Sequence, residues 1–92
     1  MGKAYVIITF RIMPTAPDVN LAEAQKGIEA EILKVGTKPH FEVKPFAFGL
    51  KAIEATFQMD EAKGGTDELE AHIKKVKGIE SVETIRIDRA LG

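Results

Sequence analysis

Residues 4–13, AYVIITFRIM, alternate between two sets of side chains. One set is strongly apolar and contains Val6, Ile8, Phe10 and Ile12. The other set contains Tyr5, Ile7, Thr9 and Arg11. Alternation with many β-branched residues predicts a β-strand whose apolar set faces a core. Because Tyr5 and Ile7 interrupt the polar set, we expect the second face to be partly covered too, as in a central strand.

Two amphipathic helices are predicted from periods of three and four residues. The first begins after Asn20, a good N-cap with Glu23 three residues later, and ends before Gly36, at about Val35. Its apolar stripe is Leu21, Ala24, Ile28 and Ile32. The second helix is capped by Thr66 and ends before Gly78. Its apolar stripe is Leu69, Ile73 and Val76.

Three further strands complete the pattern. Residues 37–45 alternate weakly and contain prolines at 39 and 45, which is typical of an edge strand. Residues 50–59 alternate clearly, and their apolar set is Ile53, Ala55, Phe57 and Met59. The last strand is predicted from Val82 to about Asp88.

The resulting order is strand, helix, strand, strand, helix, strand in a chain of 92 residues. With right-handed crossovers, this order predicts an α+β fold, the ferredoxin-like split βαβ sandwich, with two helices on one face of a four-stranded antiparallel sheet. The length fits a single domain spanning residues 1–92. Because this fold carries many unrelated activities, function has to be argued from particular residues.

Composition excludes several classes of protein. Thirteen basic and 14 acidic residues give a net charge of -1, without the basic bias of a nucleic-acid-binding domain. The absence of Cys excludes disulfides and thiolate sites. The apolar run from Ala4 to Phe10 stops at Arg11, too short to cross a membrane. We therefore expect a cytoplasmic protein with no direct nucleic-acid or membrane partner.

The sequence offers little support for catalysis or nucleotide binding. In residues 63–66, KGGT, the lysine precedes the last glycine, whereas a phosphate-binding P-loop requires it to follow. A flexible turn is the better interpretation. His40 and His72 lie far apart without metal-ligand spacing, and no pair of acids is marked as buried. We predict no catalytic residue, no metal site and no cofactor.

The unusual feature is the apolar connection Pro45-Phe46-Ala47-Phe48-Gly49-Leu50. Two phenylalanines in so short a connection cannot easily both turn inward, and an exposed aromatic side chain is typical of a protein interface. The alternative, which the local sequence alone slightly favours, is that both rings cover the open end of the core.

This connection, followed by residues 64–67, GGTD, and 79–83, IESVE, resembles archaeal translation elongation factor 1-beta. Residues 13–21, MPTAPDVNL, resemble the same family's loop after the first strand, so the resemblance covers essentially the whole chain. It implies the ferredoxin-like fold. It also implies a guanine-nucleotide exchange factor that promotes GDP release and GTP reloading on elongation factor 1-alpha, the GTPase that delivers aminoacyl-tRNA.

The resemblance also implies partner-binding residues. Phe48 matches the aromatic residue that packs against the GTPase in the eukaryotic relatives, and we expect its neighbours Gly49 and Phe46 to contribute. Arg89 is the nearest match to a C-terminal basic residue that reaches the magnesium and phosphate region, although this chain has no penultimate Lys. Arg89 follows Ile85 and Ile87 at intervals of two residues, so in a regular strand its side chain would lie on the same face and point toward the helices. Burying an unpaired charge there would be unfavourable. We therefore expect the strand to end or twist before Arg89.

Two other classes of function stay open on the residues alone. A small enzyme such as an acyl-phosphate hydrolase requires an anion-binding loop with Arg and Asn, and residues 14–20 contain no basic residue. A regulatory or small-ligand-binding domain that dimerises through its sheet is the other alternative. It predicts an obligate dimer, whereas the exchange factor is expected to be monomeric when alone.

Overall fold

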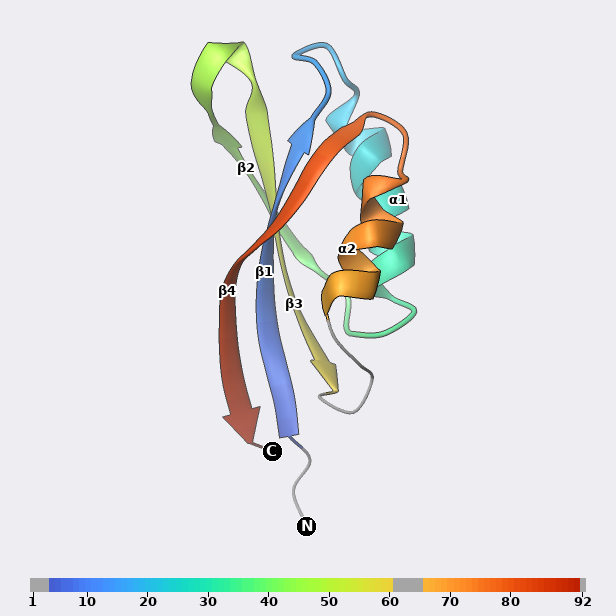
Figure 1. The fold of residues 1–92 in the computed structure, drawn as a ribbon, viewed down its shortest axis with the longest axis vertical. Coiled ribbons are helices and arrows are strands. Elements are labelled where there is room, and N and C mark those ends of the chain that lie inside the picture. Colours follow the sequence, from blue (N-terminus) through green and yellow to red (C-terminus); the bar gives the residue numbers. More distant parts are fainter. Residues whose placement is uncertain (1–3, 61–65, 92) are drawn as a thin grey trace.

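The computed structural model describes residues 4–60 and 66–91. The elements are β1 (Ala4–Pro14), α1 (Leu21–Ile32), β2 (His40–Pro45), a single 3₁₀ turn (Ala47–Gly49), β3 (Lys51–Asp60), α2 (Thr66–Lys74) and β4 (Ile79–Leu91). The strands form one antiparallel sheet in the order β2-β3-β1-β4, and both helices lie on the same side of it (Figure 1). The predicted ferredoxin-like fold is confirmed.

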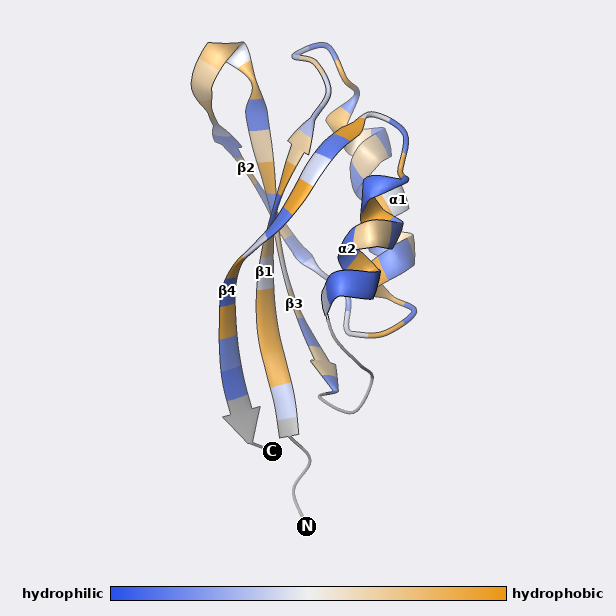
Figure 2. Ribbon diagram, in the orientation of Figure 1, coloured by the Kyte–Doolittle hydropathy of each residue, from blue (hydrophilic) through white to orange (hydrophobic). Residues whose placement is uncertain are grey.

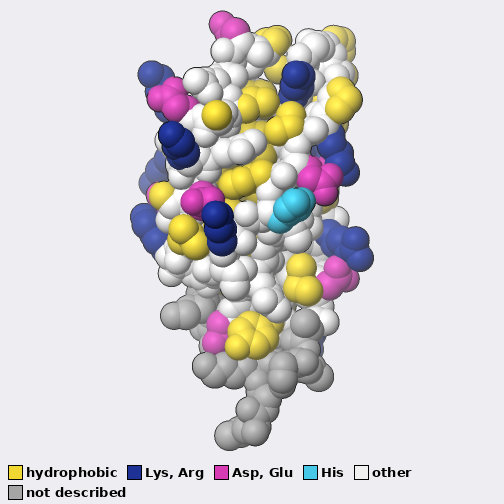
Figure 3. Space-filling model, turned by 180° about the vertical axis from the view of Figure 1, so that it is seen from behind, with side chains coloured by type: hydrophobic (Ala, Val, Ile, Leu, Met, Phe, Trp, Pro, Cys, Tyr) yellow, Lys and Arg dark blue, Asp and Glu magenta, His cyan; other side chains and the backbone are white. Residues whose placement is uncertain are grey.

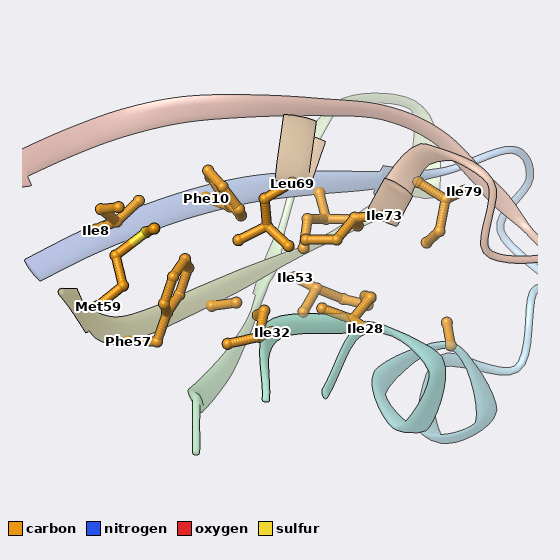
Figure 4. Packing of buried hydrophobic residues seen from close by; sticks show 13 residues of the cluster. Ile8, Phe10, Ile28, Ile32, Ile53, Phe57, Met59, Leu69, Ile73 and Ile79 are labelled. Carbon is orange, nitrogen blue, oxygen red and sulfur yellow. The ribbon is translucent and has the colours of Figure 1, made fainter. Parts of the chain in front are cut away.

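The core lies between the helices and the two central strands, β1 and β3 (Figure 4). The rings of Phe10 and Phe57 meet edge-on with centroids 5.3 Å apart. Both predicted apolar sets are buried from Ile8 onward, and Figure 2 shows a continuous hydrophobic stretch in the lower half of β1. The helices contribute the predicted residues Ala24, Ile28, Ile32, Leu69 and Ile73, all of which are buried.

The ends of the helices differ in detail from the prediction. The Asn20 side chain accepts a hydrogen bond of 3.2 Å from the Glu23 backbone N–H, which confirms the N-cap. The regular helix α1 already ends at Ile32. A Cβ atom on Gly36 would lie 2.5 Å from the Gln58 carbonyl oxygen, so this glycine allows close approach to β3. Thr66 is the first residue of α2, and the preceding loop with Lys63 lies outside the described residues.

Strand β4 is longer than predicted. The expectation that it ends or twists before Arg89 is wrong in part: it does not end there, but its register with β1 shifts at a bulge before Arg89, between Thr84 and Arg86. Arg89 pairs with Val6 of β1, and the pairing continues beyond it. The reason is the length of the helix layer. The 13 residues of β4 extend over about 40 Å, whereas the nine residues of α2 extend over about 14 Å. Figure 1 shows β1 and β4 continuing past α2, and Arg89 is accordingly exposed without leaving the sheet.

The face of the sheet opposite the helices, here termed the open face, carries the second set of each central strand. Thr9 of β1 and Thr56 of β3 lie directly opposite each other, with their hydroxyl oxygens 3.1 Å apart. Arg11 lies in register with Glu54 on one side and Glu83 on the other. The open face is therefore polar at its centre and carries charges of both signs.

Candidate functional site

The connection between β2 and β3, residues 46–50, projects from the upper end of the sheet (Figure 1) and is termed the tip. The Phe46 backbone N–H donates to the Leu50 carbonyl oxygen over 2.8 Å. The Leu50 N–H donates in turn to the Ala47 carbonyl oxygen over 3.2 Å. These two hydrogen bonds close the tip into a compact turn, so its outermost residues have a defined conformation.

Phe48 stands at the end of the tip with 94% of its surface exposed. Its φ of 61° and ψ of 32° lie in the left-handed region, which costs an ordinary side chain about 1–2 kcal/mol. The next residue, Gly49, also has a positive φ, of 76°, which glycine adopts without strain because it has no Cβ atom. The prediction of an exposed aromatic is confirmed, and the alternative that both rings cover the core is wrong. Strained backbone that displays a large apolar side chain is typical of a binding site.

Phe46 occupies the base of the tip and is half exposed. The guanidinium carbon of Arg11 lies 5.7 Å from the centre of its ring, within the range of a cation–π interaction. By its place in the sequence alone, Arg11 belongs to the outward set of its strand and has no predicted role. No local pattern connects Arg11 with Phe46, because they are brought together by the pairing of β1 with β3 and of β3 with β2.

Arg89 lies at the other end of the molecule from the tip. β4 runs toward the lower end in Figure 1, while the tip occupies the upper end. The molecule is elongated, with extents of 47 × 20 × 19 Å. The predicted site residues therefore form two separate places: Phe46, Phe48 and Gly49 at the tip, and Arg89 near the end of β4. A single partner that contacts both places has to extend along most of the long axis of this domain.

The remaining surface offers shallow hollows and paired surface charges. One hollow of about 240 Å³ lies between the start of α1 and the turn after α2, with Val19, Ala24, Val76 and Gly78 in its lining. His40 and His72 each lie beside a surface carboxylate, at 3.7 Å from Glu42 and 3.8 Å from Glu31. Seen from behind (Figure 3), apolar side chains gather in the middle of the molecule between charged ones.

Three features are absent from residues 4–60 and 66–91. No cluster of three or more metal-ligating side chains occurs among them. No polar or charged side chain in these two ranges is buried. Neither described helix is long and apolar enough to cross a membrane.

The fold and the tip are those of a ferredoxin-like binding module that displays an almost fully exposed aromatic residue on a hydrogen-bonded turn. Residues 7–90 match the family described as the EF-1 guanine nucleotide exchange domain. The chain belongs to this family, whose function is guanine nucleotide exchange in translation elongation.

Individual relatives agree with the family match. Elongation factor 1-beta of Methanocella arvoryzae is 43% identical over 88 residues, which cover 95% of this chain and 98% of the relative. Elongation factor 1-beta of Methanocaldococcus jannaschii is 36% identical over 89 residues, covering 95% and 99%. Among solved structures, LarC2, the C-terminal domain of a cyclometallase involved in synthesis of the NPN cofactor of lactate racemase, matches with a TM-score of 0.62 at 12% identity. That match covers 100% of this chain and 58% of the other, and it shows the shared fold alone.

Proposed function

We propose that this chain acts on elongation factor 1-alpha, promoting release of GDP and reloading with GTP. In this proposal residues 1–92 form a single exchange domain that works in the cytoplasm, is monomeric when alone and makes no direct contact with nucleic acid. The observation that carries the proposal is the exposure of Phe48 on a strained turn, because a folded chain gains nothing for its own stability from that arrangement.

Exchange by this domain requires binding surface and no bond-breaking chemistry. A GTPase holds GDP through magnesium and through a loop of backbone amides around the phosphates. A partner that binds the nucleotide-free conformation more tightly shifts the GTPase toward that conformation and weakens GDP binding. By linkage, binding the nucleotide-free GTPase ten times more tightly than the GDP-bound form requires about 1.4 kcal/mol of additional contact free energy. The domain is therefore proposed to act as a catalyst of exchange in its partner and not as an enzyme with its own active site.

The tip is proposed to supply the apolar part of the contact. Phe48 is free to enter a pocket of the GTPase because it is almost fully exposed and makes no contribution to the core cluster. A buried aromatic anchor of this kind commonly dominates the free energy of a protein interface. Gly49 has no side chain that could hinder a partner from approaching the Phe48 ring. The exposed half of Phe46 adds further apolar surface to the tip.

Arg89 is proposed to supply the charged part of the contact at the other end of the domain. The planar guanidinium group of an arginine matches phosphate and carboxylate groups in geometry. Since Arg89 belongs to β4 and pairs with Val6, it does not reach out on a loose tail. In this proposal the paired ends of β1 and β4 approach the magnesium and phosphate region of the GTPase together, as a rigid unit.

The proposal is tested by loading elongation factor 1-alpha with fluorescent GDP and measuring its release after adding excess unlabelled nucleotide, with and without this chain. We expect release to accelerate with the concentration of the chain and to saturate. Size-exclusion chromatography of the chain alone separates the proposal from a sheet-mediated regulatory dimer. Unchanged release together with an obligate dimer would refute the exchange function and favour that alternative.

A further inference from the structure

We infer that Arg11 is a positioning residue for the tip: from the open face of β1, near the end of the sheet that carries the tip, it holds Phe46 and thereby fixes the direction in which Phe48 points. The inference rests on the proposed role of the tip in binding the GTPase. Arg11 itself lies in the sheet, and its effect on the partner passes through the conformation of the tip.

The surroundings of Arg11 restrict where its guanidinium can lie. On β3 its direct neighbour is Glu54, and on β4 its direct neighbour is Glu83. Its Nη1 atom lies 3.5 Å from the Glu83 carboxylate, and only 35% of the side chain is exposed. Lys44 Nζ lies 3.1 Å from Glu54, so that carboxylate also has a partner on β2. The guanidinium thus lies between the Glu83 carboxylate of β4 and the Phe46 ring, whose centre is 5.7 Å from its carbon atom.

The contact acts on the residue where the tip begins. Phe46 donates the hydrogen bond that closes the tip onto Leu50, so its ring is held by Arg11 of β1 and its backbone N–H by the last residue of the tip. Phe48 follows two residues later in a left-handed conformation that a free peptide seldom populates. A tip that is already ordered loses less conformational entropy when it binds. Holding Phe46 therefore improves binding without Arg11 touching the partner.

Three variants separate this role from general effects on the sheet. Arg11→Met keeps an unbranched apolar stem and removes the guanidinium. Arg11→Lys keeps a cation that is able to lie over the ring. Glu83→Gln is the matched control, because it removes the charge paired with Arg11 while the amide oxygen of Gln still accepts a hydrogen bond from the guanidinium, so the Phe46 contact stays in place.

The first readout needs no partner. Amide hydrogen exchange is measured by NMR for Phe46, whose N–H donates to Leu50, and for Thr15, whose N–H donates to Gly78 in another loop at the same end. In Arg11→Met we expect Phe46 to exchange about two- to fivefold faster, the factor that corresponds to a cation–π contact at an exposed site. Thr15 should not change, nor should Phe46 in Glu83→Gln. Equal Phe46 exchange in wild type and Arg11→Met would overturn the inference.

The second readout uses GDP release from elongation factor 1-alpha. Arg11→Met should raise the concentration of chain that gives half-maximal release by about two- to fivefold and leave the maximal rate unchanged, because only the order of the free tip is affected. Arg11→Lys should recover most of the loss. The double variant with Arg11→Met and Phe46→Leu should need little more chain for half-maximal release than Phe46→Leu alone. A lower maximal rate, or fully additive losses, would contradict a positioning role. If wild type fails to accelerate release, the proposed function is wrong, while the amide exchange still decides whether Arg11 orders the tip.

Discussion

At the scale of single residues, Phe48 combines two features that are each unfavourable for folding. Its ring stays in water, and its backbone occupies the left-handed region that bulky side chains avoid. Phe57 shows the opposite arrangement, with the same side chain buried against Phe10. Phe57 therefore serves the fold, and we propose that Phe48 serves a contact outside the chain.

Phe48→Ala should leave the melting temperature nearly unchanged and weaken association with elongation factor 1-alpha by roughly 1–3 kcal/mol. Calorimetry of unfolding and titration with the GTPase measure the two effects. Phe57→Ala is the matched control, because truncating a buried ring costs about 3–5 kcal/mol of stability. A large drop in melting temperature for Phe48→Ala, with normal exchange by the folded fraction, would show that the ring is a core residue.

Two glycines should respond to the same substitution for different reasons. Gly36→Ala places a methyl group 2.5 Å from the Gln58 carbonyl oxygen, so the backbone has to move, at a cost of about 1–3 kcal/mol. Gly49→Ala meets no atom within 4 Å and costs about 1 kcal/mol, from its positive φ alone. Denaturant unfolding of both variants checks this prediction. Full stability of Gly36→Ala would mean that the loop after α1 does not press against β3.

At the scale of elements, the alternation in β1 and β3 and the stripes of both helices were enough to predict the fold and the core. Each of these patterns is local, and burial follows from it directly. The course of β4 was not predictable in the same way. The pairing places Thr84 opposite Phe10 and Arg86 opposite Thr9, so Ile85 is an extra residue in a bulge. The bulge and the shortness of the helix layer arise only when the elements pack together. Neither changes the periodicity of apolar residues in the sequence, so the course of β4 could not be predicted from it.

The candidate site was predictable in part for a similar reason. The tip is one continuous run, so its aromatic content is visible in the sequence, and its exposure could be proposed from the shortness of the connection. The contact of Arg11 with Phe46 depends on the register of three strands, which no single segment contains. Arg89 was identified through a family resemblance, which did not indicate that this residue pairs with Val6 of β1.

Arg89→Ala should slow stimulated GDP release at saturating concentration while changing stability by less than about 0.5 kcal/mol, since the side chain is exposed. A chain that ends at Asp88 should lose the same activity and also some stability, because the pairing of Ala4, Tyr5 and Val6 with β4 is removed. Release assays and thermal unfolding of both variants distinguish the two effects. Equal release rates for wild type and Arg89→Ala would remove Arg89 from the mechanism.

At the scale of the whole molecule, the two proposed contacts lie at opposite ends of a domain 47 Å long. The tip and the end of β4 are connected by the two central strands, whose core residues are almost fully buried. Such a body is stiff along its strands. We therefore expect it to bind as a rigid piece that sets the relative position of two parts of the GTPase.

The chain on its own should bind neither GTP nor GDP. Residues 63–66 lack P-loop spacing, and the described surface offers shallow hollows and no cluster suited to a metal ion. Isothermal titration calorimetry with each nucleotide and magnesium, in the absence of a GTPase, checks this. Micromolar affinity would show that the domain has a nucleotide site of its own.

We expect this domain to catalyse nucleotide exchange in its partner and to be released unchanged after each cycle. The decisive measurement follows release of fluorescent GDP from elongation factor 1-alpha when the chain is present at a small fraction of the GTPase concentration. We predict that nearly all of the labelled GDP is released in many turnovers, at a rate proportional to the amount of chain. Release that stops after one equivalent of the chain, or that proceeds at the spontaneous rate, would contradict the claim.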